Sequence, residues 1–345
     1  GAGACLGVDG SEDGFWQYVG TDVMVYKLRK CKLKRFDRDS ARQCLAGRHL
    51  LHIGDSLTRY QYLSLIHMLH KDWVDPVGAA GQFHPCKEAW GQGGWGIFYL
   101  KSSEIFEGKE TCDCYRRDGP MSAITQQTLH ENRFYHDKEL NISVSYLQLF
   151  GEIAMRGHWP AECFNQPIGD VCGPKTMSRQ NLANTKQLTE ADVERNKVSK
   201  FDWTGNPNWV MKEIVPYMQA DTMLLNTGLW SELKDTEKTR ELFQLGHDAM
   251  TPFQARGKKA FWKRTTTKLL CHRKTGVRQC QADDKRETYI YPDTIPLQVA
   301  PEKSWGVYDV ASPTQKLPWK YWSDEVHFRP FVYNELNNLL LNMIC

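Results

Sequence analysis

One short segment, residues 50–61, constrains the fold of this chain more than any other. It reads Leu-Leu-His-Ile-Gly-Asp-Ser-Leu-Thr-Arg-Tyr-Gln, an apolar run that ends in Gly-Asp-Ser. After Ser56, apolar residues recur at helical spacing, at Leu57, Tyr60, Leu63, Ile66 and Leu69. This pattern predicts a buried strand, a tight turn and a helix whose N-terminus carries the serine.

Ser56 is a candidate nucleophile because of that position. The spare backbone N–H groups and the dipole at a helix N-terminus favour negative charge. A serine there can attack a carbonyl carbon while its own N–H binds the resulting oxyanion. The alternative is structural, since Ser and Asp are ordinary N-cap residues and Gly-Asp-Ser is a common tripeptide.

A second motif, Asp324-Glu325-Val326-His327, lies near the C-terminus. Asp324 and His327 are three residues apart, so on one helical turn both would face the same point. A histidine oriented by a carboxylate is the base that a serine hydroxyl needs at neutral pH. An isolated Asp-x-x-His is more often a surface aspartate and a packing histidine. Its combination with an early Gly-Asp-Ser favours a triad of Ser56, His327 and Asp324.

Strands and helices alternate along the chain. Apolar or β-rich runs predict strands at residues 48–53, 142–150, 222–226 and 259–264. Helical periodicity predicts helices at residues 57–70 and 331–344. The alternation predicts an α/β fold with a doubly wound parallel sheet, in which active residues collect at the carboxyl ends of the strands.

All of residues 1–345 are expected to form one catalytic domain. Residues 1–45 are predicted to be an irregular, cysteine-tied lead-in, with Phe15 and Trp16 as a packing anchor. A polar segment from about residue 155 to residue 215 is predicted to form a loop-rich lobe inserted over the site.

Several segments, in this order along the chain, resemble the PC-esterase group of the SGNH/GDSL hydrolase superfamily. The resemblance is strongest to the trichome-birefringence-like polysaccharide O-acetyltransferases of plants. The segments that carry it are Cys31–Phe36, Leu45–Leu50, Gly54–Arg59, Leu225–Trp230, Phe261–Thr265, Asp324–Phe328 and Asn334–Leu340. The resemblance implies an SGNH-hydrolase-like three-layer sandwich and supports the Ser56, His327 and Asp324 triad.

The resemblance also implies an oxyanion hole. In the superfamily, a serine N–H, a glycine N–H after the second strand and an asparagine amide after the third share this task. The matching residues here are Ser56, Gly151 and Asn226. For Asn226 the structural alternative is a turn-forming residue close to Gly228. Arg59 matches an arginine of the family that can contact substrate or lock the loop.

Eleven cysteines are many for a chain of this length. They predict disulfides formed in an oxidising compartment. Cys163 with Cys172, and Cys271 with Cys280, bracket short loops and are candidate local pairs, although the sequence leaves the connectivity open. The segment Cys112-Asp113-Cys114 lacks the usual gap of zinc-binding cysteines, so no metal site is predicted.

Other features limit the cellular compartments and the kinds of partner that the sequence allows. A glycosylation sequon at Asn141-Ile142-Ser143 agrees with the secretory pathway, so we expect a Golgi-lumen or secreted protein. The sequence contains no run of about 18 apolar residues, so no membrane span is predicted. The net charge of +3 is too small to argue for nucleic acid. No glycine-rich nucleotide fingerprint occurs, so no bound cofactor is predicted.

Three functions remain open. The first is an O-acetyltransferase that moves an acetyl group through an acyl-serine to a hydroxyl of a glycan. Its acetyl donor, acetyl-CoA or another acetyl carrier, would be a co-substrate. The second is a carbohydrate acetyl-esterase that uses the same triad with water as the acceptor. The third is a non-catalytic glycan-binding relative, which has no need of all three triad residues.

Overall fold

The computed structural model describes residues 14–19, 24–71, 106–115, 130–150, 155–157, 203–229, 237–254, 259–269, 272–274, 277–279, 288–318, 321–322 and 325–345. Gly151, Asp324 and the four cysteines of the two candidate local pairs lie outside these ranges.

A seven-stranded sheet forms the centre of the described structure, in the order β15-β10-β9-β3-β6-β5-β4. The five strands from β15 to β6 are parallel, whereas β5 is antiparallel to both β6 and β4. The strands are β3 (His49–Gly54), β4 (Glu110–Tyr115), β5 (His130–Asp137), β6 (Ile142–Gln148), β9 (Thr222–Leu225), β10 (Lys259–Lys263) and β15 (Gly306–Tyr308). The predicted α/β fold is therefore present, but its sheet is mostly rather than wholly parallel.

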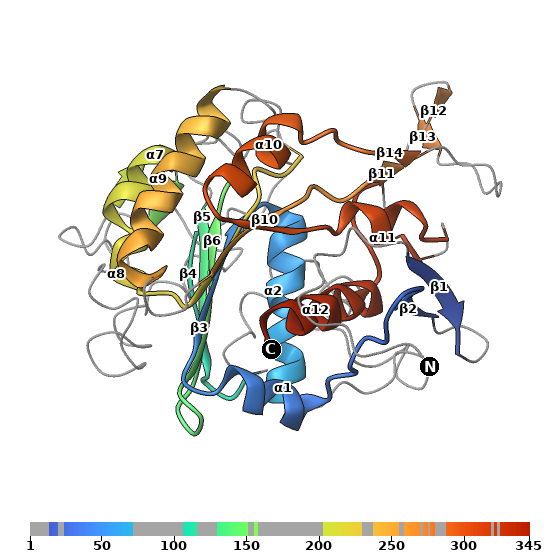
Figure 1. Ribbon diagram of the computed structural model, residues 1–345, viewed down its shortest axis with the longest axis horizontal. Helices are drawn as coiled ribbons and strands as arrows, with labels where there is room; N and C mark the ends of the chain where they lie inside the picture. The colour runs from blue at the N-terminus through green and yellow to red at the C-terminus, as the bar shows by residue number, and fades with distance from the viewer. Residues whose placement is uncertain are drawn as a thin grey trace.

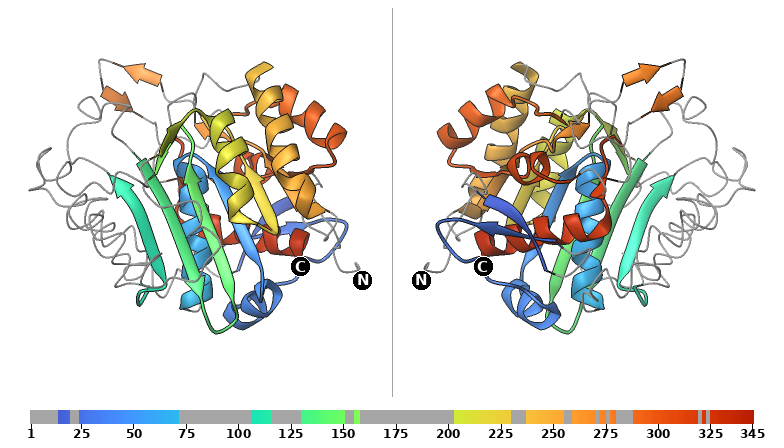
Figure 2. Two further views of the ribbon diagram at one scale, coloured as in Figure 1. Left: turned by 90° about the vertical axis from the view of Figure 1, so that its left-hand side faces the viewer. Right: turned by 90° about the vertical axis from the view of Figure 1, so that its right-hand side faces the viewer.

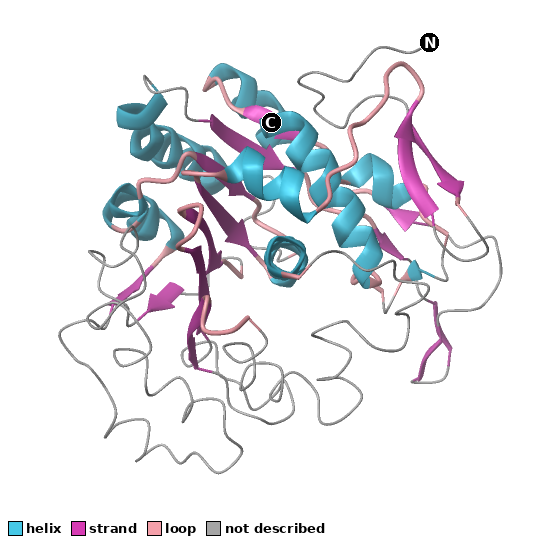
Figure 3. Ribbon diagram, turned by 90° about the horizontal axis from the view of Figure 1, so that it is seen from below, coloured by secondary structure: helices cyan, strands magenta, loops and turns pink. Residues whose placement is uncertain are grey.

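Helices cover both faces of this sheet (Figure 1). On one face lie α1 (Arg38–Leu45), α2 (Ser56–His70) and α12 (Pro330–Ile344). On the other lie α7 (Pro207–Glu213), α8 (Val215–Met218), α9 (Glu237–Gln254) and α10 (Thr294–Glu302). Seen from below, the strands run between these two groups of helices (Figure 3).

The alternation of side chains along each strand explains the two layers. Leu50 of β3 and Leu224 of β9 join the core beneath α2 and α12. Leu51 and Met223, their neighbours in sequence, join the core beneath α9 and α10. Successive side chains of a strand point to opposite faces, so a strand that is apolar at every position must be covered on both sides.

Short paired strands lie outside the central sheet (Figure 2). They are β1 (Gly14–Tyr18) with β2 (Met24–Leu28), β7 (Met155–Gly157) with β8 (Trp203–Gly205), β11 (Lys268–Leu269) with β14 (Thr288–Tyr289), and β12 (His272–Lys274) with β13 (Val277–Gln279). A further short helix, α11 (Ala311–Gln315), contacts β1.

The strands and helices expected in the sheet are found within one or two residues of the expected bounds. The lead-in differs, because its described part forms the β1–β2 hairpin and α1 rather than irregular chain. Trp16 does act as an anchor, since its indole N–H donates to the carbonyl oxygen of Pro313 at 2.8 Å. Residues 203–215 also differ from a loop-rich lobe, because Val210 and Met211 of α7 are buried in the core beneath α9.

A disulfide joins Cys44, at the end of α1, to Cys345 at the C-terminus, with 5.8 Å between the Cα atoms. Such a bond is typical of a secreted or luminal compartment. No helix in the described ranges has the length and apolar character to cross a membrane.

Candidate active site

The turn between β3 and α2 is fixed by Asp55, which is fully buried. One carboxylate oxygen accepts from the backbone N–H of Leu57 at 3.0 Å and thereby caps α2. The other oxygen accepts from the backbone N–H of Leu229, after β9, at 2.9 Å. Asp55 therefore connects the β3–α2 turn to the loop that follows β9.

Two more contacts hold this turn in place. The Tyr146 hydroxyl of β6 donates to the carbonyl oxygens of Gly54 and Asp55, at 3.0 and 3.2 Å. A Cβ atom at Gly54 would lie 2.4 Å from the Thr58 hydroxyl oxygen, so only glycine allows this close approach of strand and helix. The backbone on both sides of Ser56 is thus tightly constrained.

Ser56 is the one partly exposed residue in an otherwise buried segment. From His49 through His70, every other residue is buried. A partly exposed polar residue in the middle of a buried strand–turn–helix is available to a substrate, whereas its neighbours are occupied with packing.

The structure brings Ser56 and His327 together. The Ser56 hydroxyl oxygen lies 2.8 Å from Nε2 of His327, although 271 residues separate them in the sequence. This is the hydrogen bond through which an imidazole accepts the proton of a serine nucleophile. The predicted pair therefore has the geometry of a nucleophile and its base.

The loop that carries His327 is held by packing. The Tyr60 ring of α2 contacts the His327 ring edge-on, with 5.1 Å between the ring centres. It also stacks on the Tyr333 ring, with 5.4 Å between the ring centres. A bridge between Trp322 and Phe328 closes the loop at its base. Residues 325 and 326 form a bend, and His327 follows it outside any helix or strand. Asp324 lies outside the described residues.

Asn226 follows β9 at the same edge of the sheet. Parallel pairing of Ile53 with Leu225 places it beside the end of β3. Its side-chain amide donates to the carbonyl oxygen of Lys263 at 2.8 Å and to the Thr265 hydroxyl at 3.2 Å. Both amide hydrogens thus have protein acceptors, so donation to an oxyanion requires one of these bonds to be exchanged.

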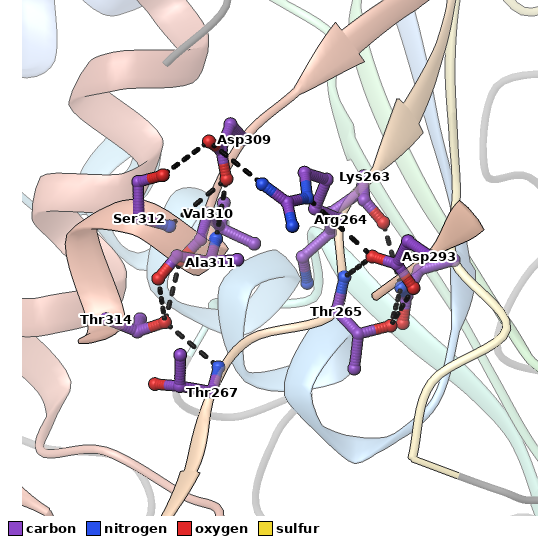
Figure 4. A network of polar contacts seen from close by, with 11 residues as sticks. Lys263, Arg264, Thr265, Thr267, Asp293, Asp309, Val310, Ala311, Ser312 and Thr314 are labelled. Atoms are coloured by element: carbon purple, nitrogen blue, oxygen red, sulfur yellow. Dashed lines mark hydrogen bonds and ion pairs between the residues drawn. The ribbon is translucent and has the colours of Figure 1, made fainter. Parts of the chain in front are cut away.

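The Asp293 carboxylate accepts two hydrogen bonds from Thr265 (Figure 4). It accepts from the backbone N–H of Thr265 at 2.9 Å and from its hydroxyl at 3.3 Å. Burial raises the pKa of Asp293 to about 6, while these bonds and the Arg264 guanidinium act in the opposite direction. Asn226, Thr265 and Asp293 form a continuous polar chain.

Lys263, the last residue of β10, lies beneath the first turn of α2. Its side chain is buried, and its ammonium group donates to the Thr58 hydroxyl at 3.1 Å. Burial lowers the pKa of Lys263 to about 8, and the negative charge of Asp55 partly offsets this effect.

The remaining predicted residues are placed as follows. The Arg59 guanidinium carbon lies 5.7 Å from the centre of the Tyr60 ring, and Arg59 is buried. Asn141 is exposed in the turn before β6, at the amino end of that strand and so at the edge opposite Ser56. Gly151 lies outside the described residues.

Sequence reasoning did not single out Lys263, Thr265 or Asp293. Lys263 and Thr265 lie in the Phe261–Thr265 segment, where a lysine ends an apolar strand, and this was an available signal. Asp293 lies in a polar stretch that gives no local indication of its contact with Thr265.

Among the residues that the structure describes, no cluster of three or more histidine, cysteine or acidic side chains could hold a metal ion. The chain matches no model of a known protein family and no curated protein sequence.

Proposed function

We propose that this protein is an O-acetyltransferase that moves an acetyl group through an acyl-serine on Ser56 to a hydroxyl of a glycan. One observation carries the proposal, the 2.8 Å contact between the Ser56 hydroxyl and His327 Nε2. It occurs at the partly exposed position of a buried turn, at the N-terminus of α2. The resemblance to the PC-esterase group and to an SGNH-type sandwich supports the same chemistry.

In this mechanism His327 removes the proton of Ser56 as the oxygen attacks the acetyl carbonyl carbon of the donor. The tetrahedral intermediate collapses, the donor's leaving group takes the proton from His327, and acetyl-Ser56 remains. His327 then removes a proton from a sugar hydroxyl, whose oxygen attacks the acyl-serine. The acetylated glycan leaves and Ser56 regains its proton.

The other roles belong to the same proposal. Asp324 orients His327, while the Ser56 N–H, the Gly151 N–H and the Asn226 amide stabilise the oxyanion. Arg59 contacts substrate or locks the turn. The acetyl donor is acetyl-CoA or another acetyl carrier, and the location is the Golgi lumen or the extracellular space, with a glycan at Asn141.

A carbohydrate acetyl-esterase is the second candidate. Ser56 and His327 both remain partly exposed, so water can reach the acyl-serine. Acetyl transfer requires that the acceptor hydroxyl outcompete water at this point. The esterase differs from the transferase only in whether water or a sugar hydroxyl attacks the acyl-serine.

The test is intact-mass spectrometry of the protein after incubation with an aryl acetate and with acetyl-CoA, with and without oligosaccharides. We expect one added acetyl group that maps to Ser56 and is discharged faster when an acceptor is present. Ser56→Ala and His327→Ala should form no adduct. Ser64→Ala is the matched control, because Ser64 is a buried serine on the same helix.

Discharge at one rate with or without sugar would establish the esterase instead. A wild-type protein that forms no adduct with any donor would contradict both enzymes and leave the glycan-binding protein as the better interpretation.

A further inference from the structure

A buried positive charge lies directly beneath the turn that carries Ser56. Lys263 is 2 % exposed, and the Thr58 hydroxyl that accepts its hydrogen bond is fully buried. Thr58 is in the first turn of α2, two residues after Ser56. Removal of an ammonium ion from water is unfavourable unless it is compensated, so a lysine in such a place calls for an explanation.

The hydrogen bond to Thr58 alone does not explain the charge. The hydrogen bond to Thr58 is one that a neutral donor could also make. Asp55 is the carboxylate whose charge stabilises the protonated Lys263. Asp55 in turn binds the backbone N–H groups of Leu57 and Leu229. The ammonium group therefore acts on the same turn twice, through Thr58 and through Asp55.

Among the described residues, His52 and Tyr308 also lie beside Lys263, and both are neutral at physiological pH. His52 of β3 is fully buried, and burial followed by the Lys263 charge lowers its pKa to about 3. Tyr308 of β15 pairs with Lys263 in the sheet, and burial holds its pKa well above the ordinary value. Of Lys263, His52 and Tyr308, only Lys263 therefore changes its charge between pH 7 and 10.

We propose that Lys263 is a positioning residue of the active site, whose positive charge holds the first turn of α2 and favours the negative charge that develops next to Ser56. The helix N-terminus carries a partial positive charge, but the Asp55 carboxylate caps the same turn. The buried cation beneath the turn offsets this negative charge and so keeps the potential next to Ser56 favourable to an anion. This inference rests on the proposed acyl-serine chemistry and extends it to a residue that touches neither substrate nor Ser56.

The test is the rate of Ser56 acetylation by an aryl acetate from pH 6.5 to 10, followed by intact mass, in the wild type and two variants. Acetylation by the wild type should fall as pH rises through about 8, where Lys263 loses its proton. Lys263→Met should be slower by roughly tenfold at pH 7 and should lack this decline. Lys263→Arg keeps its charge at alkaline pH, so it should stay active where the wild type declines.

A parallel measurement follows the charge itself. In protein labelled with ¹³C at the lysine ε-carbon, one signal should titrate with a midpoint near pH 8 and be absent from Lys263→Met. If Lys263→Met does not fold, Lys263→Arg and the wild-type titration still decide the matter.

The outcomes are distinguishable. An alkaline decline in Lys263→Met or Lys263→Arg equal to that of the wild type would overturn the role of Lys263 and leave the acyl-serine mechanism intact. So would a wild-type rate that is flat across the midpoint of the lysine signal. Failure of the wild type to form acetyl-Ser56 at any pH would overturn the proposed function and this inference with it.

Discussion

Asp293 adopts a left-handed backbone conformation, with φ of 47°, at the position just before α10. Aspartate tolerates this region better than most residues, but it still costs about 1 kcal/mol. At such a position an aspartate usually caps the helix, yet the Asp293 side chain makes no capping bond to α10. Its carboxylate binds Thr265 instead, so the residue serves the chain of contacts that leads to Asn226.

Replacement of Thr265 tests that chain. Thr265→Val keeps the shape of the side chain but removes the hydroxyl that joins Asn226 to Asp293. The Thr265 hydroxyl is one of the two acceptors that fix the orientation of the Asn226 amide. If that orientation is what lets the amide stabilise the oxyanion, acetylation of Ser56 should slow by roughly 10- to 100-fold in steady-state or single-turnover measurements. Thr265→Ser should stay close to the wild type.

Thr266→Val is the neighbouring control, because Thr266 is equally buried and its hydroxyl has no partner among the described residues. Equal rates for Thr265→Val and Thr266→Val would exclude Thr265 from the mechanism.

At the scale of elements, the β3–α2 turn is the feature that presents Ser56. Its geometry depends on the close contact of Gly54 with Thr58, on the cap from Asp55 and on the Tyr146 hydroxyl. The strand and the helix thus meet with no room for a side chain at Gly54. A change there should disturb both the stability of the protein and the position of Ser56.

Gly54→Ala places a methyl group against Thr58. We expect a loss of about 1–3 kcal/mol in the free energy of unfolding, measured by urea denaturation. The double variant Gly54→Ala with Thr58→Ala removes the hydroxyl oxygen and the methyl group of residue 58 but keeps its Cβ atom, which would lie 2.8 Å from the new one. Its loss should therefore be smaller than the sum of the two single losses without vanishing. Strict additivity would show that the contact does not determine the effect.

At the scale of the whole molecule, the last helix is connected to the segment of residues 34–44 near the start of the described chain. The Cys44–Cys345 disulfide spans 301 residues and joins α1 to the end of α12. Near it, the Asn342 side chain accepts from the Lys34 backbone N–H and donates to the Lys34 carbonyl oxygen, at 2.8 and 2.9 Å. Because α12 packs on α2, these connections also stabilise the layer that carries the active site.

Removal of this disulfide should destabilise the protein. A cross-link over so long a loop restricts the unfolded chain strongly, so Cys44→Ser with Cys345→Ser should lower the unfolding free energy by about 2–5 kcal/mol. The measurement is urea denaturation without reductant. Reductant should lower the midpoint of the wild type by more than that of the double variant, because only the wild type has this bond to lose. An unchanged midpoint in the double variant without reductant would refute the role of the disulfide.

The sequence by itself determined several strands and helices of the central layers and the candidate residues. Apolar runs and helical spacing are local properties, and they were sufficient to predict β3, α2, β9, β10 and α12. The motifs likewise predict Ser56 and His327 as a candidate nucleophile and base. The pattern did not identify the hairpin of β1 and β2, because β1 (Gly14–Tyr18) lacks a regular alternation of buried and exposed residues.

Only the tertiary structure decided which groups meet. The contact between Ser56 and His327 joins positions 271 residues apart, and it depends on how α12 and its preceding loop pack on α2. The buried Lys263 and the Asn226–Thr265–Asp293 chain depend on burial and on the order of strands in the sheet. The spacing of apolar residues along the chain indicates the type of one helix or strand. The burial and the contacts of a side chain depend on which other elements pack against it.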